Sequence, residues 1–278
     1  MDRTVGDEIF KATARLRETG IDSPQLDAQL LLAHALNCTR LDVITHPERE
    51  LSEPQWRIFR EYVEKRTQRY PLAYITGSKE FFGLSFEVSP AVLIPRPETE
   101  ILVEECLKRV GDAPLIADIG TGSGAIAVSL AVNSPNARIW ATDISEDALA
   151  VARSNARKHS VAERVNMVQG DLLAPILALN LTFDAVVSNP PYIARRVIES
   201  LDPEVRCEPM QALTDSADGL EIIRLLFNQA REVTRLLLIE IGIGQAEDVA
   251  KIARGAGWNE IEFVRDLAGI ERVAIAYR

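Results

Sequence analysis

From residue 115 to residue 255, short apolar runs alternate with longer stretches of helical spacing, and this alternation constrains the fold more than any other feature. The runs have the length and β-branched composition of buried strands. Repeated strand–helix units predict a mostly parallel sheet that is covered by helices on both faces, with right-handed crossovers. We therefore expect an α/β, doubly wound, Rossmann-like domain. Strands are expected at 115–119, 137–142, 165–169, 183–188 and 236–241, and helices at 124–132, 148–158, 220–233 and 245–255.

The chain ends in two further predicted strands, 260–265 and 272–277. The loop between them, residues 266–269, is too short for the crossover that parallel strands need. We therefore expect a terminal antiparallel hairpin at the end of the parallel sheet.

Residues 1–73 have a different character and predict a small helical bundle. Ser23-Pro24 is a pattern typical of a helix start, and Ser52 with Gln55 forms a capping-box pattern. The apolar face of the helix that begins there is expected to contain Trp56, Phe59, Val63 and Tyr70, and the arginines at 57, 60, 66 and 69 are expected on a solvated face. This module shows no catalytic pattern, which favours a role in substrate recognition.

Residues 74–96 are rich in glycine, aromatic and β-branched residues and predict a β-hairpin linker to a catalytic domain at 97–278. Arg96 lies between two prolines, so its backbone is fixed in an extended loop, which suits either an ion pair or a binding rim. Pro97 is well placed to begin the next helix.

The charge balance and the scattered metal-binding residues narrow the class of protein. A net charge of −10 argues against a protein that binds nucleic acid directly, because basic surfaces supply most of that affinity. Three cysteines and three histidines lie far apart with no paired spacing, so we expect no metal and no disulfide. The acidic N-terminus does not resemble a signal peptide, and no apolar run is long enough to span a membrane. We expect a soluble cytoplasmic monomer that does not bind membranes.

A glycine-rich loop follows the first predicted strand of the sheet and is the candidate cofactor site. Its residues are Gly120, Thr121, Gly122, Ser123 and Gly124. Glycines let the backbone turn sharply and approach a ligand, and the next helix offers free N–H groups.

Acidic residues at the ends of the next two strands extend this candidate site. Asp143 can grip both hydroxyls of a ribose, and Asp171, followed by Leu172, can border an adenine pocket or serve only as a turn residue. Gly120, Gly122 and Ala125 also satisfy the dinucleotide-binding pattern. The loop therefore leaves two cofactors open, a nicotinamide dinucleotide or S-adenosylmethionine.

Asn189-Pro190-Pro191-Tyr192 follows the fourth predicted strand, at the edge where an open parallel sheet binds its ligands. A hydride-transfer enzyme usually needs a proton donor at that position, and none is offered. This stretch instead suits a clamp for a flat polar group, because it offers the amide of Asn189, two prolines with a fixed backbone, and the ring of Tyr192. Such a clamp favours methyl transfer. The alternative reading of this stretch is a strand-ending turn that Asn189 caps.

Asp-Ile-Gly-Thr-Gly-Ser-Gly (118–124) together with Asn-Pro-Pro-Tyr (189–192) resembles the class I S-adenosylmethionine-dependent methyltransferases that modify planar nitrogens in adenine, guanine or glutamine. Further motifs resemble the peptide chain release factor glutamine methyltransferases, the HemK/PrmC family, and the likeness covers most of residues 70–278. These motifs are Pro-Leu-Ala-Tyr-Ile-Thr-Gly (71–77), Glu-Phe-Phe-Gly-Leu (80–84), Ile-Pro-Arg-Pro-Glu-Thr-Glu (94–100), Glu-Pro (208–209), Asp-Gly-Leu (218–220), and Glu-Ile-Gly (240–242) with Gln245. The family often has paired glycines where this chain has Asp-Ser-Ala (215–217), so the conformation of the 193–217 loop stays open.

The resemblance implies transfer of a methyl group from S-adenosylmethionine to the side-chain amide nitrogen of the glutamine in the Gly-Gly-Gln motif of class I release factors. In that reaction Asn189 also borders the cofactor. Its side-chain oxygen and the Pro190 carbonyl would accept the two amide hydrogens and stabilise the charge that develops on nitrogen. Pro191 and Tyr192 would complete the substrate site, with the ring stacked on the amide.

Two rival functions remain. A DNA adenine or RNA base methyltransferase would use the same clamp on a base amine, although the acidic balance opposes it. A non-catalytic binding protein could use the fold as a scaffold, although Gly120, Gly122, Asp143 and Asn189 are all in place.

Overall fold

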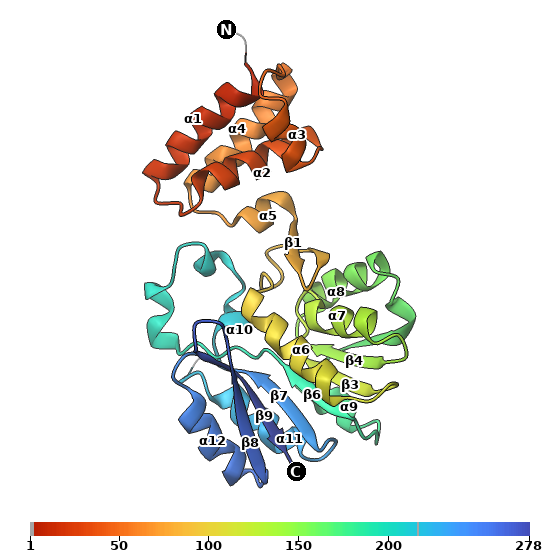
Figure 1. The fold of residues 1–278 in the computed structure, drawn as a ribbon. Coiled ribbons are helices and arrows are strands. Elements are labelled where there is room, and N and C mark those ends of the chain that lie inside the picture. Colours follow the sequence, from red (N-terminus) through yellow and green to blue (C-terminus); the bar gives the residue numbers. More distant parts are fainter. Residues whose placement is uncertain (1–2, 216) are drawn as a thin grey trace. The chain divides into compact units, whose positions relative to one another are not determined.

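The computed structural model describes residues 3–215 and 217–278, which form two compact units (Figure 1). One unit comprises Met1–Gly77 together with Asp202–Cys207, and the other comprises Ser78–Leu201 together with Glu208–Arg278. The chain therefore leaves the second unit after Leu201 and returns to it at Glu208.

The first unit is helical, as the sequence predicts. Its helices are α1 (Val5–Glu18), α2 (Pro24–Leu36), α3 (Arg40–Thr45), α4 (Glu53–Thr67) and α5 (Leu72–Thr76). The Ser52 N–H donates to Gln55 Oε1 at 3.1 Å, so the capping pair at the start of α4 is confirmed. Phe59 and Val63 are buried against α1 and α2 residues such as Leu16 and Leu31, which explains why α4 has an apolar face.

The prediction of a solvated arginine face is wrong for Arg66 and Arg69. Arg66 is 5% exposed, and its Nε lies 2.7 Å from Asp27 Oδ2. Glu204 belongs to residues 202–207, which are part of this unit. Its Oε1 lies 3.0 Å from Arg66 Nη1 and 3.1 Å from Arg69 Nε. A buried guanidinium needs such acidic partners, and they come from distant parts of the chain.

The predicted hairpin begins later than its sequence pattern indicates. Residues 72–76 form helix α5, which starts after Pro71 and ends at Gly77 in the left-handed region at φ 69°. This proline–glycine pair favours a short helix over a strand. The hairpin itself consists of β1 (Ser78–Phe81) and β2 (Leu84–Glu87), which pair antiparallel.

The second unit contains the predicted doubly wound sheet. Its strand order is β5-β4-β3-β6-β7-β9-β8, in which β3 to β7 are parallel and β9 is antiparallel to both β7 and β8. The predicted terminal antiparallel hairpin is therefore confirmed. The strands are β3 (Leu115–Ile119), β4 (Arg138–Asp143), β5 (Val165–Gln169), β6 (Ala185–Ser188), β7 (Leu236–Glu240), β8 (Glu260–Arg265) and β9 (Glu271–Tyr277).

Helices cover both faces of this sheet, and alternate strand residues bury against each layer. On β6, Ala185 and Val187 belong to the core beneath α6, α7 and α8, whereas Val186 belongs to the core beneath α9, α11 and α12. This alternation follows from the period of two in a strand. The helices are α6 (Glu100–Arg109), α7 (Ala125–Asn133), α8 (Glu146–Lys158), α9 (Ala174–Leu177), α10 (Met210–Leu213), α11 (Glu221–Ala230) and α12 (Ala246–Gly255).

β3 and β6 are neighbours at the centre of the sheet, and the chain turns in opposite directions from them. This is the switch point, where loops leave the carboxyl ends of two adjacent strands in different directions and open a crevice. Among the described residues, no helix is long and apolar enough to cross a membrane.

Candidate active site

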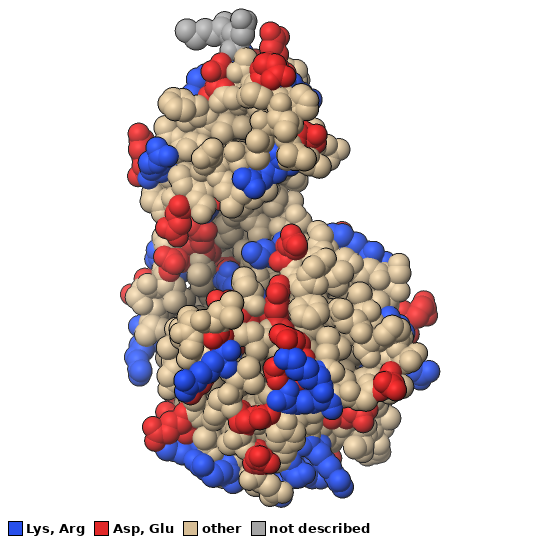
Figure 2. Space-filling view, in the orientation of Figure 1, with Lys and Arg blue, Asp and Glu red and all other residues tan. Residues whose placement is uncertain are grey.

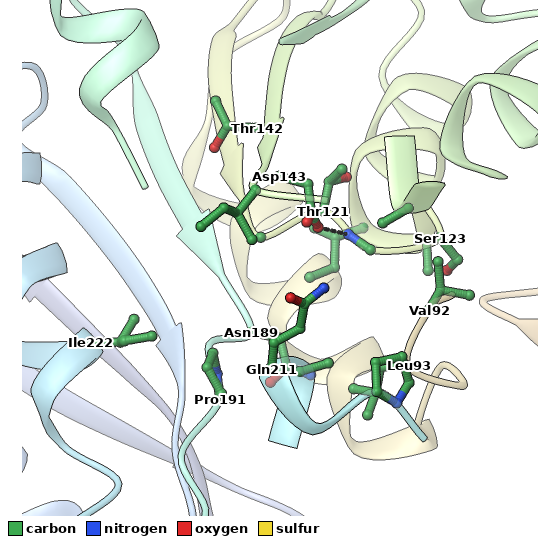
Figure 3. A pocket seen from close by; sticks show the side chains of 18 of the residues that line it. Val92, Leu93, Thr121, Ser123, Thr142, Asp143, Asn189, Pro191, Gln211 and Ile222 are labelled. Atoms are coloured by element: carbon green, nitrogen blue, oxygen red, sulfur yellow. Dashed lines mark hydrogen bonds between the residues drawn. The ribbon is translucent and has the colours of Figure 1, made fainter. Parts of the chain in front are cut away.

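A cavity of about 360 Å³ lies at the carboxyl ends of β3, β4 and β6, and it is lined only by residues of the second unit. Figure 3 shows the Asn189 amide pointing into it, with Thr121 and Asp143 on one side and Leu93 and Gln211 on the other. The predicted site residues among the lining are Gly120, Thr121, Gly122, Ser123, Asp143, Asp171, Leu172, Asn189 and Pro191. The structure thus brings together residues that lie up to 71 positions apart, from 120 to 191.

The glycine loop is shaped for a ligand. Gly120 and Gly122 have φ values of 72° and 55°, and a Cβ at either position would meet no atom within 4 Å. The left-handed conformation explains why glycine is needed, and the open space leaves the backbone accessible. Gly124 does not line the cavity. A Cβ on it would lie 3.1 Å from Ala152 Cβ, so this glycine lets the loop pack against α8.

Asp143 holds this loop through its own carboxylate. Its Oδ2 accepts a hydrogen bond from the Gly122 N–H at 2.8 Å, and its Oδ1 accepts one from the Ser145 N–H at 2.9 Å. Burial raises the pKa of Asp143, while these two N–H donors lower it. Each carboxylate oxygen retains a second lone pair, so the same side chain can also receive hydroxyl donors.

Asp118, near the end of β3, supports the glycine loop, and its sequence position did not indicate this contact. It is fully buried, and its Oδ2 accepts hydrogen bonds from Thr121 Oγ1 at 2.7 Å and the Ala127 N–H at 3.2 Å. Burial raises the pKa of this carboxyl to about 7. The available signal was an acidic residue inside an otherwise apolar strand.

The turn after β6 is fixed at both of its ends. The Asn189 Nδ2 donates to Thr99 Oγ1 at 3.0 Å, and Gln245 Nε2 donates to the Tyr192 carbonyl at 3.0 Å. Tyr192 and Pro190 are not among the residues that line the cavity. The Tyr192 hydroxyl instead donates to Glu240 Oε1 at 3.1 Å, at the end of β7, and burial raises the pKa of Tyr192.

Arg96 forms an ion pair with Glu208, which is one of the two roles that its sequence position suggests. Glu208 also accepts a hydrogen bond from the Ile94 N–H at 3.0 Å through its other oxygen. These contacts tie the start of the 208–217 segment to the loop before α6. Pro209 and Gln211 of that segment line the cavity. Ser216, part of the departure from the family pattern, lies outside the described residues.

The candidate ligands of a metal and the distribution of surface charge bear on the class of site. Among the described residues, no group of three or more His, Cys, Asp or Glu side chains is arranged to hold a metal ion. On the face of the molecule shown in Figure 2, basic and acidic side chains are intermixed over the second unit.

Solved structures of methyltransferases share the fold over most of this chain. The hMettl16 catalytic domain in complex with the MAT2A 3'UTR hairpin 6 matches with a TM-score of 0.60 and 19% identity, over 77% of this chain and 81% of that chain. A methyltransferase from Pyrococcus furiosus matches with a TM-score of 0.55 and 18% identity, over 77% of this chain and 98% of that one. The N-terminal domain of human METTL16 in complex with SAH matches with a TM-score of 0.53 and 17% identity, over 70% and 76% of the two chains. These similarities show that this chain has the fold of the methyltransferases.

Sequence relatives are much closer. A PrmC N-terminal domain model matches residues 9–77, and a methyltransferase small domain model matches residues 97–212. The release factor glutamine methyltransferase of Moorella thermoacetica is 43% identical over 99% of both chains. That of Nitratidesulfovibrio vulgaris is 41% identical over 96% of this chain and 92% of the relative. The fold, the pocket and the relatives agree, and the chain belongs to the release factor glutamine methyltransferase family.

Proposed function

We propose that this protein transfers a methyl group from S-adenosylmethionine to the side-chain amide nitrogen of the glutamine in the Gly-Gly-Gln motif of class I peptide chain release factors. The observation that carries the proposal is the joint position of Asn189, the glycine loop and Asp143 on one cavity. Membership of the family supports the choice of acceptor.

The cofactor side of the cavity fits S-adenosylmethionine. The backbone of Gly120–Gly124 is open to close approach at Gly120 and Gly122, and the Asp143 carboxylate is positioned to receive ribose hydroxyls. Asp171 and Leu172 line the same cavity and suit the border of an adenine site. When bound, the cofactor would supply an electrophilic methyl group and leave as S-adenosyl-L-homocysteine, and the methylated nitrogen would then lose one proton to water.

The substrate side must aim and polarise a poor nucleophile, because the lone pair of an amide nitrogen is delocalised into its carbonyl. We assign the Asn189 side-chain oxygen as the acceptor for one amide hydrogen and the carbonyl of Pro190, which lies between the lining residues Asn189 and Pro191, as the acceptor for the other. Both acceptors favour the positive charge that develops on nitrogen, where fixed dipoles are most effective. Pro191 borders the cavity, and Tyr192 holds the turn through Glu240.

No metal is needed for this step, because the proposed acceptors are oxygen atoms of the chain itself.

We further propose that residues 1–73 recognise the release factor, that 74–96 act as the linker and 97–278 as the catalytic domain. The acceptor is a translation factor, so we propose that a monomer of the enzyme acts in the cytoplasm.

A competition experiment tests this function. Purified protein is incubated with methyl-labelled S-adenosylmethionine and equal amounts of a release factor, DNA and ribosomal RNA. We expect label in the release factor alone. Label found only in nucleic acid would replace the proposal with a base methyltransferase, and cofactor binding without transfer to any acceptor would favour a binding protein.

A further inference from the structure

The amide of Asn189 has a carbonyl oxygen that accepts hydrogen bonds and an NH2 group that donates them, and only one orientation serves the proposed reaction. If the NH2 group faced the substrate amide, two donors would oppose each other. The side chain cannot select its own orientation, since the two ends have almost the same shape. A neighbour must therefore distinguish them.

Thr99 is that neighbour. It is 4% exposed and lies in the short 3-10 helix Pro97–Thr99 before α6. Its Oγ1 lies 3.0 Å from Asn189 Nδ2 and 2.5 Å from Glu240 Oε2. A hydroxyl has one hydrogen to donate and lone pairs to accept with. If that hydrogen goes to Glu240, Thr99 offers Asn189 only an acceptor, and the Asn189 NH2 group must face it.

Glu240 takes that hydrogen when it is ionised, because a carboxylate has none of its own to donate. It is 1% exposed and ends β7, the strand next to β6. Its other oxygen accepts the Tyr192 hydroxyl at 3.1 Å. One buried carboxylate thus receives hydroxyl donors that lead to both ends of the Asn189–Tyr192 turn.

We propose that Thr99 and Glu240 are positioning residues that hold the Asn189 amide with its oxygen toward the substrate nitrogen. This inference rests on the proposed function and deepens it. Asn189 lines the cavity and its Nδ2 is engaged by Thr99, so the amide oxygen is the end that we assign to the acceptor amide. The residues that touch the substrate would be Asn189 and the Pro190 carbonyl, whereas Thr99 and Glu240 act through them.

The protonation state of Glu240 decides which way this chain of hydrogen bonds runs. Burial raises its pKa to about 7, while the Thr99 and Tyr192 hydroxyls lower it, Glu98 raises it and Arg272 lowers it. A protonated Glu240 can donate to Thr99, whose hydroxyl can then donate to the Asn189 oxygen and reverse the amide. Methyl transfer should therefore rise with pH as Glu240 ionises.

Thr99→Val removes the hydroxyl at nearly constant shape. We expect kcat to fall about 10- to 100-fold, as for other residues that orient a reacting group, with little change in the Kd for S-adenosylmethionine. Thr99→Ser retains a hydroxyl and should restore most of kcat. Thr234→Val is the matched control, because it removes another buried threonine hydroxyl at the opposite end of β7 and should leave kcat unchanged.

Glu240→Gln supplies the second test, through the pH profile of kcat. The wild-type profile should rise through about pH 7, and the variant should lack that step. Equal activity of Thr99→Val and the wild type, equal loss in Thr99→Ser and Thr99→Val, or an unchanged pH step in Glu240→Gln would overturn the proposal.

A readout without any methyl acceptor separates this inference from the proposed function. In protein labelled with heavy nitrogen at asparagine, the Asn189 side-chain signal is assigned by its loss in Asn189→Ala. We expect it to titrate with Glu240, and this titration to vanish in Thr99→Val and Glu240→Gln. A signal indifferent to both changes contradicts the inference even if release factor is methylated. A responsive signal in a protein that methylates no release factor contradicts only the proposed function.

Discussion

The two halves of the pocket are built by different means. The half that we propose for the cofactor is built around one loop, Gly120–Gly124, whose shape depends on left-handed glycines and on the hydrogen bond from the Gly122 N–H to Asp143. The substrate half depends on side chains from distant segments, with Thr99 and Glu240 separated by 141 positions. A loop that is fixed by its backbone conformation suits a cofactor that is the same in every reaction. Side-chain hydrogen bonds instead set which way the Asn189 amide points. Substitutions in one half should therefore lower mainly cofactor affinity, and substitutions in the other should lower mainly the rate of methyl transfer.

The largest effect is expected for Asn189→Ala. The methylation rate should fall by at least about 100-fold, because a preorganised polar contact to the reacting nitrogen is lost. Cofactor affinity should stay within roughly tenfold of the wild type, since this half is held by other residues. Calorimetric titration with S-adenosylmethionine and single-turnover methyl transfer measure the two quantities. Equal losses in both would make Asn189 mainly a cofactor or folding residue.

Gly219→Ala should damage the substrate half through the backbone. Gly219 has φ 82°, and a Cβ there would lie 2.2 Å from the Tyr192 carbonyl oxygen, so the Asn189–Tyr192 turn must shift. Displacements of about 1 Å can cost about 100-fold in rate, and we expect a loss approaching that value with cofactor affinity retained. Gly269→Ala is the control, because it has φ 79° but no atom within 4 Å of a new Cβ. Similar kinetics in the two variants would contradict the close contact.

Asp143→Ala should damage the cofactor half instead. The half-buried Gly122 and Ser145 N–H groups lose their acceptor, and the proposed ribose hydroxyls lose a charged acceptor, a contact of about 1.5–3 kcal/mol. We expect cofactor affinity to fall roughly 10- to 100-fold, with kcat at saturating cofactor nearly unchanged. Asp143→Asn retains one acceptor oxygen and should lose less affinity. A fall in kcat without a change in cofactor Kd would break the division between the halves.

The smallest expected effect concerns stability. The folded pKa of Glu240 is about 7, above its ordinary value of 4.5, so the folded state binds more protons than the unfolded state between these values. The contribution of Glu240 to the free energy of unfolding therefore declines as pH rises through this window. Glu240→Gln stays neutral and should gain stability relative to the wild type as pH increases.

Urea unfolding of both proteins from about pH 5 to about pH 8 measures this difference. If the free energy of unfolding of Glu240→Gln minus that of the wild type stays constant or falls with rising pH, Glu240 is not held at a raised pKa. The account predicts that ionised Glu240 favours methyl transfer and disfavours folding, so activity and this stability term should change in opposite directions with pH.

The cofactor half was predictable because its signals are local. A few neighbouring residues are enough to predict a cofactor loop here: glycines follow an apolar strand, and Asp143 ends the next strand. The position of Asn189 beside this loop was also predictable, because an open parallel sheet places the ends of β3 and β6 side by side. The alternation of strands and helices likewise predicted the sheet and its terminal hairpin.

The substrate half was not predictable in the same detail. Nothing near Thr99 in the sequence indicates that Glu240 receives its hydrogen, because the contact exists only after the sheet has formed. Stacking of Tyr192 on the substrate stays a prediction, whereas the contact of its hydroxyl with Glu240 could not be read from the sequence. Arg66 resembled a solvated residue because its neighbours in α4 are charged, whereas its acidic partners lie far away in the chain.

The most direct test of the account is a mass spectrum of the tryptic peptide that contains Gly-Gly-Gln, taken from a release factor incubated with this protein and S-adenosylmethionine. We expect a mass gain of one CH2, with fragment ions that assign it to the glutamine side chain, and at most about one hundredth of that gain over the same time when Asn189→Ala replaces the wild type. An unmodified peptide with the wild-type protein, or a methyl group on any other residue, would contradict it.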